Sequence, residues 1–338
     1  MVEDITIFAL AERDDWVAAH RDGGLPSQSW DYAWGLSASG AVPQLAIVRA
    51  AGARMLLPFV ERQWLGSTDI STILGISGAS IAPDCGAPLA LWHEFAASRG
   101  WVAGYIQLAV SVALEDCAFP GRLVANNTTF LFDLRNEPTP SSLSQAIRRK
   151  IRRVERIGAV LVDDIPILVE ALQRLYPPAM RRLGAAPYFR FAPVTLARWA
   201  ASPTAMILGA QVDGVIEAVY LCLLADGHAE FHIFAASEIG RGLSAWLIWQ
   251  GMPRLRQRGA TCLNLTGGMR PGDGLYRFKA GFSGAPTPRR AVHQVYDQVR
   301  YDELCLRSGA TAGTGWFPAY RAPRESAAAL STQESVPP

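Results

Sequence analysis

The sequence predicts a mixed α/β protein of two domains, each with a central, largely antiparallel sheet flanked by helices. First, the chain has 338 residues, of which 50% are hydrophobic, and this is enough material for two cores. Second, strand-like and helix-like segments form two series, which a turn-rich break at 136–140 (NEPTP) separates. Third, Asp213-Gly214 and Asp226-Gly227 divide three apolar runs, the pattern of an antiparallel meander.

The first half begins with a strand and then predicts helices over residues 13–20 and 27–39. The apolar runs at 45–49 and 55–62 flank a short turn and predict a hairpin. Residues 64–88 are rich in Gly, Ser and Pro, and predict a long loop. The remaining elements expected in this half are a helix at 89–100 and strands at 101–110 and 127–134.

The sequence of the second half predicts more helices than that of the first. Helices are expected at 141–158, 165–184, 193–202, 242–259, 272–283 and 297–307. Strands are expected at 159–163, 205–212, 215–225, 228–236, 261–265 and 286–295. Pro177-Pro178 predicts an interruption of the second of these helices, because proline has no backbone N–H to donate.

These breaks predict the domain boundaries. We expect one domain over 1–140 and a second over 141–285, with residues 286–318 as a candidate completion of the first. We also expect two separate sheets rather than one continuous sheet. The segment 319–338 is rich in Pro, Ala and Ser, which predicts a disordered tail.

Charge and cysteine content narrow the function classes. The formal net charge is only +2, so the whole chain has no general attraction for polyanions. The five cysteines are widely spaced and include no Cys-x-x-Cys, which predicts neither a disulfide framework nor a metal site. The acidic N-terminal stretch does not resemble a signal peptide, and no apolar run reaches the ~20 residues of a membrane span. We therefore expect a cytoplasmic protein.

The helix expected at 141–158 is strongly basic. Glu155 is the one acid within the run 148–156, whereas Ile147, Ile151 and Val154 form an apolar stripe that predicts a buried face. Its exposed basic side chains are Arg148, Arg149, Lys150, Arg152, Arg153 and Arg156. A solvated helix face normally mixes signs, so this one indicates a phosphate-bearing partner, with Arg148, Arg149, Arg152 and Arg153 as the donor-binding candidates.

Residues 228–284 contain a strand, a glycine-bearing loop, a long helix, a second strand, a glycine pair and then RFKAGF at 277–282. This order resembles the second domain of the FemAB-like aminoacyl and peptidyl transferases, which consist of two linked GNAT-type domains. The matching residues are Gly267, Gly268, Gly274, Leu275, Phe278, Lys279, Gly281 and Phe282. The resemblance covers most of 1–307 and is weaker in the first half.

The resemblance implies that Phe278 and Lys279 lie at the acyl-transfer centre and contact the 3′ end of a tRNA, with Arg277 beside them. An aminoacyl ester is already activated, so an amine can attack it directly, and a fixed ammonium would stabilise the developing oxyanion. Glu230 and His232 alternate on one face of the strand at 228–236, and either is a candidate to take the amine proton.

Two further groups are candidates for substrate contacts. The loop Ser237–Gly242 matches the pyrophosphate loop of ordinary GNAT enzymes at Gly240 and Gly242, with Arg241 between them, but Ser237 departs from that pattern. The match at Gly240 and Gly242 favours an acyl-coenzyme A donor. Trp30, Tyr32 and Trp34 are candidate walls of an acceptor pocket.

Three functions remain open from the sequence. The first is transfer of an aminoacyl group from aminoacyl-tRNA to a small-molecule amine, in a natural-product, cell-wall or glycan precursor. The second is N-acylation from acetyl-CoA or another acyl-CoA, and the third is RNA binding without catalysis. Neither donor would be a tightly bound cofactor. The acceptor, the amino acid and the oligomeric state are not determined by the sequence.

Overall fold

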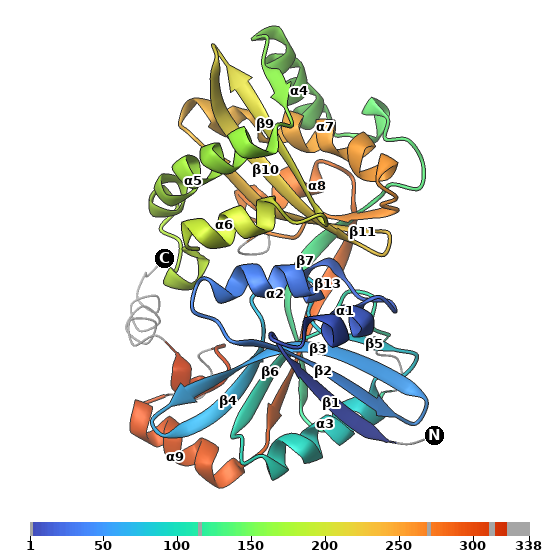
Figure 1. Cartoon of the computed structure of the whole chain (residues 1–338), viewed down its shortest axis with the longest axis vertical. Coiled ribbons are helices and arrows are strands. Elements are labelled where there is room, and N and C mark those ends of the chain that lie inside the picture. Colours follow the sequence, from blue (N-terminus) through green and yellow to red (C-terminus); the bar gives the residue numbers. More distant parts are fainter. Residues whose placement is uncertain (1–2, 114–116, 269–271, 311–314, 323–338) are drawn as a thin grey trace, which may run out of the picture.

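The computed structural model describes residues 3–113, 117–268, 272–310 and 315–322. It confirms the mixed α/β fold class, with helices on both faces of a large mixed sheet. Figure 1 shows two halves stacked along the long axis of the molecule, with β7 and β13 running between them. No helix within the described ranges is long and apolar enough to cross a membrane.

The first half contains seven strands and three helices among the described residues. The strands are β1 (Asp4–Ala9), β2 (Pro43–Ala50), β3 (Ala53–Trp64), β4 (Ser67–Thr72), β5 (Ser80–Ala82), β6 (Ala103–Gln107) and β7 (Arg122–Asp133). The helices are α1 (Arg13–His20), α2 (Trp30–Ser37) and α3 (Gly86–Ser98). The expected loop at 64–88 is therefore wrong, because β4 and β5 lie within it and both pair with β3.

The second half carries the meander. Its strands are β8 (Val160–Val162), β9 (Ala205–Val212), β10 (Val215–Ala225), β11 (His228–Ala236), β12 (Cys262–Asn264) and β13 (Ala285–Val295). Its helices are α4 (Gln145–Arg156), α5 (Ile165–Arg182), α6 (Pro193–Ala200), α7 (Ser244–Gln257), α8 (Gly274–Ala280) and α9 (Gln298–Ser308). The expected interruption of α5 is wrong, since it continues through Pro177 and Pro178. Burial of Leu175, Tyr176 and Ala179 offsets the missing hydrogen bonds.

The strands form one continuous hydrogen-bonded series, in the order β1-β2-β3-β4-β6-β13-β7-β12-β11-β10-β9-β8. The expectation of two separate sheets is therefore wrong. The sheet is continuous because β7 and β13 are long, pair with each other and reach both halves. Near its end β13 pairs with β6, and the end of β7 at Asp133 pairs with β12. The domain boundaries themselves stay a prediction.

The chain beyond Pro318 packs against the first half. Tyr320 is only 1% exposed, and its hydroxyl donates to Asp69 Oδ2 over 3.0 Å. Arg321 Nε lies 2.5 Å from the same oxygen, and Arg62 pairs with Oδ1 of Asp69 at 2.6 Å. The expected disorder is thus wrong for residues 319–322, because a buried carboxylate holds them. Residues 323–338 lie outside the described residues.

We expect Asp69→Asn to lower the free energy of unfolding by about 3–5 kcal/mol, because it removes the shared carboxylate of a buried ion cluster. Urea unfolding followed by circular dichroism measures this loss. Asp133→Asn is the control, since its pair with Arg135 is exposed and solvent screens it, so its midpoint should stay near that of the wild type. Equal midpoints for the two variants would contradict a stabilising role for the cluster.

Candidate functional site

The two parallel strands of the second half diverge at one point. β11 and β12 pair over only three residues, and the last pair is Glu230 with Asn264. Beyond it β11 continues to Ala236, whereas the chain after β12 turns towards β7, where Leu265 N donates to Phe130 O over 2.9 Å. The sheet therefore opens between residues 231–236 and the segment that follows Asn264.

Lys279 lies at this divergence. Its ammonium donates to Thr266 Oγ1 on one side and lies 4.9 Å from the centroid of the Phe231 ring on the other. The side chain is only 3% exposed, and burial lowers its pKa to about 7, assisted by the positive charge of Arg289. Lys279 thus links the two diverging segments, and near pH 7 it can exist as an ammonium or an amine.

Helix α8 carries Lys279 and is fixed at both ends. Asp273 caps its start by accepting from Tyr276 N over 2.6 Å. At its end Ser144 N donates to Gly281 O over 2.9 Å, and a Cβ at Gly281 would lie 2.8 Å from Ile147. Phe282 is fully buried, with the Phe278 ring 5.5 Å away. The motif RFKAGF therefore anchors α8 to α4.

Glu230 lies at the end of the β11–β12 pair, on the face of β11 that is opposite to Lys279. Its side chain is 3% exposed, Oε1 accepts from Ser77 Oγ over 2.6 Å, and Oε2 has no hydrogen-bond partner among the described residues. Burial raises its pKa to about 7, although Ser77, Ser27 and Arg289 act against this shift. A buried carboxyl with a free oxygen and this pKa is suited to general-base chemistry near neutral pH.

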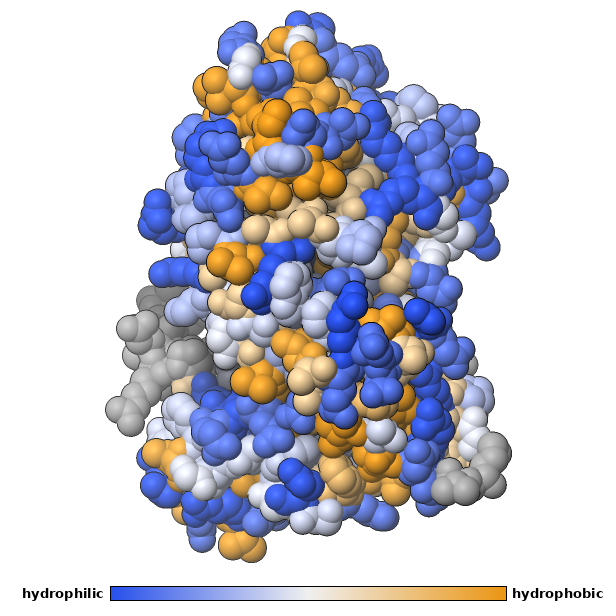
Figure 2. All heavy atoms as spheres, in the orientation of Figure 1, coloured by the Kyte–Doolittle hydropathy of each residue, from blue (hydrophilic) through white to orange (hydrophobic). Residues whose placement is uncertain are grey.

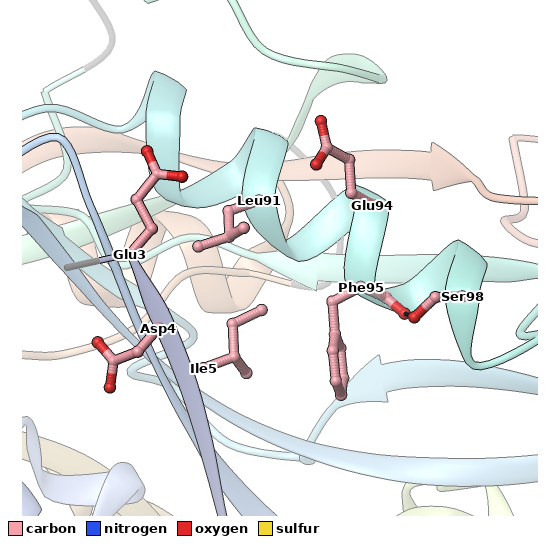
Figure 3. A pocket seen from close by; sticks show the side chains of 7 residues that line it. All are labelled: Glu3, Asp4, Ile5, Leu91, Glu94, Phe95 and Ser98. Atoms are coloured by element: carbon pink, nitrogen blue, oxygen red, sulfur yellow. Dashed lines mark hydrogen bonds between the residues drawn. The ribbon is translucent and has the colours of Figure 1, made fainter.

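Glu230 also lines a cavity of about 110 Å³ at the junction of the two halves. The other lining residues are Leu25, Ile76, Ser77, Val110, Ser111, Leu131, His228, Ala229, Cys262 and Asn264. A larger, open hollow of about 440 Å³ lies between β1 and α3, with side chains from both elements facing it (Figure 3). That hollow offers only acidic, apolar and hydroxyl groups, so the junction cavity is the better candidate site.

His232 is a weaker candidate base than the sequence suggested. Its ring lies 4.5 Å from that of Trp199 and 5.2 Å from that of Tyr32, and burial lowers its pKa to about 3. So weak a base stays neutral and accepts protons poorly at physiological pH. The four predicted catalytic residues also do not form one cluster. Lys279 and Phe278 lie on one face of β11, whereas Glu230 and His232 lie on the other.

The structure does not bring Trp30, Tyr32 and Trp34, the predicted walls of an acceptor pocket, together on one face of α2. Residues two apart on a helix face different directions, whereas residues four apart share a face. Accordingly Trp30 and Trp34 stack on each other with centroids 5.6 Å apart, and Tyr32 is buried against Trp199 at 5.1 Å. Tyr32 is part of the core that joins α2 to α6.

The loop that resembles a pyrophosphate site forms a short 3₁₀ helix, Ile239–Leu243, which leads into α7. Gly240 is required there, because a Cβ would lie 1.9 Å from Glu217 O, but its N–H already donates to Ser237 Oγ over 3.0 Å. A Cβ at Gly242 would meet open space, and Arg241 pairs with Glu238 at 3.0 Å. The need for glycine at Gly240 is therefore structural.

The basic helix is built as predicted. Ile147, Ile151 and Val154 are buried, and Ser144 caps the helix by accepting from Ile147 N over 3.3 Å. Arg149, Arg152 and Arg153 are exposed and Arg148 is half-buried. Within the described ranges no basic group of α4 has an ion-pair partner.

The basic helix also lies beside the two other candidate donor contacts. It packs against α7 and the 3₁₀ helix, and Lys150 Nζ lies 5.0 Å from the centroid of the Phe278 ring. Arg277 is exposed on α8, the helix that contains Phe278. The basic face, the loop and the motif helix therefore converge on one side of the second half, where α4, α7 and α8 lie together in Figure 1. Figure 2 shows the same orientation, in which hydrophobic residues run down the middle of the upper half and hydrophilic residues lie to either side.

Sequence reasoning missed Arg289 and Ser77. Arg289 of β13 donates to Gln107 Oε1, and its positive charge acts on both Glu230 and Lys279. It stands in a Pro- and Arg-rich tract that is typical of exposed edges, so its sequence context gives no sign of these contacts. Ser77 comes from the other half, and no local pattern indicates its contact with Glu230.

The second half matches a known family of domains. Residues 141–280 match the family described as "Acetyltransferase (GNAT) domain". The match runs from the turn before α4 to the end of α8, and therefore includes β11, the 3₁₀ helix, α7 and Lys279. No match was found among the curated proteins.

Solved structures resemble the chain over almost its whole length. FemX is 14% identical, with 89% of this chain and 99% of that chain covered and a TM-score of 0.62. The C-terminal domain (DUF2156) of a putative lysylphosphatidylglycerol synthetase from Agrobacterium fabrum is 17% identical, with 89% and 96% covered and a TM-score of 0.58. L-PGS from Bacillus licheniformis is 13% identical, with 81% and 90% covered and a TM-score of 0.54. At these identities the likeness is one of fold: the chain shares the fold of FemX, and its residues 141–280 match the GNAT acetyltransferase domain.

Proposed function

We propose that the protein is an acyltransferase that moves an aminoacyl group from an aminoacyl-tRNA to a small-molecule amine. The observation that carries this proposal is the basic face of α4, which has no ion-pair partner in the described residues and lies beside α8 and the loop at 239–243. The phosphates of a tRNA end would neutralise this face while the 3′ ester reaches the divergence of β11 and β12. A tRNA donor would place the reaction in the cytoplasm.

The chemistry needs only groups that the chain supplies. The acceptor amine attacks the ester carbonyl, a C–N bond forms, and the C–O bond to the ribose breaks. In this proposal the ammonium of Lys279 stabilises the oxyanion, and Glu230 takes the proton from the amine and returns it to the ribose oxygen. Glu230 and Lys279 lie on opposite faces of β11, so the proposal requires the amine and the ester carbonyl to meet where the pairing of β11 with β12 ends.

The similar structures support an aminoacyl donor. One neighbour is named a putative lysylphosphatidylglycerol synthetase, so synthesis with a lysyl group is attributed to a protein of this fold. An acyl-CoA donor is the second candidate, because the matched domain is described as an acetyltransferase and a 3₁₀ helix leads into α7. The occupied Gly240 N–H disfavours it, since that amide is not free for a pyrophosphate.

One experiment separates the three functions. Protein is mixed with a candidate amine and either a mixed, radiolabelled aminoacyl-tRNA pool or radiolabelled acetyl-CoA, and the product is tested for label. We expect label from the tRNA pool and no measurable binding of CoA. Label from acetyl-CoA, or a tight CoA complex, would establish the alternative donor. Binding of tRNA with no transfer to any amine would support the non-catalytic function.

We expect the change of Arg148, Arg149, Arg152 and Arg153 to Gln to weaken tRNA binding regardless of tRNA sequence. Removing one phosphate contact should lower the slope of log affinity against log salt by roughly one, and somewhat less where the RNA is single-stranded. Filter binding over a salt series measures the slope. The fold should persist, because the apolar stripe of α4 is unchanged.

The matched control for this variant removes the same charge elsewhere. Arg13, Arg49, Arg99 and Arg307 changed to Gln lower the net charge equally but lie outside the matched domain. The control should keep most of the affinity. An equal loss in both variants would mean that general charge attracts the tRNA and that α4 is not the contact.

A further inference from the structure

Three potential metal ligands converge in the first half, on residues that the proposed reaction does not use. One ligand atom each of Asp84, Cys85 and Cys117 lies within 4.8 Å of the other two. Cys117 Sγ donates to Asp84 Oδ1 over 3.2 Å, and Cys85 is only 1% exposed. Asp84 and Cys85 are far from Cys117 in sequence, so folding brings the two thiols and the carboxylate together.

The backbone holds the two segments in contact. Gly86 begins α3, and its N–H donates to Asp84 Oδ1 over 3.0 Å. A Cβ at Gly86 would lie only 2.7 Å from Ala118 O, so the approach of the segment after Cys117 requires glycine. The carboxylate is thus already oriented towards Cys117 by a backbone donor, as the ligands of protein metal sites commonly are.

The donor set indicates which metal would bind. Oxygen-only sites suit Mg²⁺ and Ca²⁺, whereas thiolates select softer ions, and Zn²⁺ accepts sulfur and carboxylate oxygen in tetrahedral geometry. We propose that Asp84, Cys85 and Cys117 bind Zn²⁺, with water as the fourth ligand. The ion would connect the start of α3 to the segment after Cys117 and so stabilise the first half.

Proton release should accompany binding. Zinc binds the thiolate form of cysteine, so each thiol must release its proton when the metal binds. Affinity should therefore increase as the pH rises through the neutral range. No sequence pattern indicates this site, because adjacent Asp and Cys residues and one distant Cys match no spacing typical of zinc sites.

The test uses full-length protein, reduced and stripped of metal, titrated with Co²⁺ and then Zn²⁺. We expect one Co²⁺ per chain, a thiolate-to-cobalt charge-transfer band, d–d bands typical of four-coordinate cobalt, and their loss when Zn²⁺ is added. Zn²⁺ should also raise the melting temperature of the wild type, and a chelator should reverse the rise.

Single substitutions then assign the ligands. Cys117→Ser and Asp84→Asn are expected to weaken Zn²⁺ binding by more than the roughly 10–100-fold typical for loss of an outer hydrogen-bond partner. Cys305→Ser, a half-buried cysteine on α9, is the control and should bind like the wild type. Circular dichroism confirms folding, and Cys117 is chosen because it is less buried than Cys85.

The proposal is overturned if the reduced wild type shows no charge-transfer band, or if Cys117→Ser binds as tightly as Cys305→Ser. It is also overturned if Cys85 and Cys117 form a disulfide in the isolated protein and the reduced pair then takes up no metal. Mass spectrometry of peptides from protein digested without reductant detects that disulfide.

Discussion

Replacing Glu230 with Gln is expected to lower the rate of amide formation about 10²–10⁴-fold, the usual contribution of a positioned general base. The carboxyl is buried, lines the junction cavity and has one oxygen without a hydrogen-bond partner among the described residues. Because its pKa is about 7, the wild-type rate should also fall as the pH drops below about 7, where Glu230 is protonated. The variant should lack this acidic decline.

The same substitution should stabilise the fold. The pKa of Glu230 is higher in the folded chain than its ordinary value, so the folded state binds the proton more tightly, and ionisation costs stability as the pH rises from about 4 to about 7. Gln removes that cost and keeps the hydrogen bond from Ser77 through its amide oxygen. Above about pH 7 the variant should unfold at higher urea concentration than the wild type, and near pH 4 at a similar one.

Single-turnover transfer from aminoacyl-tRNA and urea unfolding at several pH values measure the two effects. We expect the variant to be slower and more stable than the wild type, because a buried catalytic group often supports activity at the expense of stability. An unchanged rate would exclude Glu230 as the base. A variant less stable than the wild type at every pH would show that its carboxyl serves the core.

Replacing Lys279 with Met is expected to lower kcat about 10²–10³-fold, the typical loss for one oxyanion donor, with little change in donor affinity. Met keeps an unbranched side chain against Phe231 but removes the charge. Lys279→Arg keeps a charge in a planar group and should restore the rate only in part. Because the pKa of Lys279 is about 7, the ammonium is lost as the pH rises above about 7, and the wild-type rate should fall there.

The stability of Lys279→Met provides a second measurement. The pKa of Lys279 is lower in the folded chain than its ordinary value, so burial of the ammonium costs stability that increases as the pH falls from about 10 to about 7. Met removes this cost, so the variant should be more stable than the wild type at and below neutral pH. A Lys279→Met rate within about threefold of the wild type, under ~1 kcal/mol in the barrier, would mean that the lysine is structural.

The chain's other lysine serves as the comparison. Lys150 lies over the Phe278 ring on the basic helix, so Lys150→Met should affect tRNA affinity but not the rate at saturating donor. Rate loss at Lys279 and affinity loss at Lys150 would separate chemistry from binding.

Features set by neighbouring residues could be predicted from the sequence. The turns at Asp213-Gly214 and Asp226-Gly227 have positive φ at all four residues, as Asp-Gly turns between strands require. The buried stripe of α4 follows from the helical period alone. The alternation of Glu230 and His232 also placed both on one face of β11, but their roles depend on what covers that face. Ser77 leaves one oxygen of Glu230 free, whereas the rings of Trp199 and Tyr32 enclose His232.

Features that depend on distant contacts could not be predicted. Lys279 was expected to reach substrate, and only the tertiary contacts with Thr266 and Phe231 show it buried between diverging segments. The pairing of β13 with β6 joins residues far apart in sequence, so no local pattern indicates one continuous sheet. Tyr32 was grouped with Trp30 and Trp34 as a pocket wall, and only its tertiary contact with Trp199 shows that it belongs to the core.

The shared ladder of β7 and β13 limits how substrates reach the junction cavity. A hinge between the halves would have to distort the backbone hydrogen bonds between β7 and β13 along Ala285–His293. This shared ladder therefore makes the connection between the halves rigid. Opening by rotation of whole domains is therefore disfavoured, and access must come from the short segments that border the cavity, such as those containing Leu25 and Ile76. The shared ladder should also make the two halves unfold together in one cooperative transition, because β7 and β13 lie in the middle of a sheet to which both halves contribute.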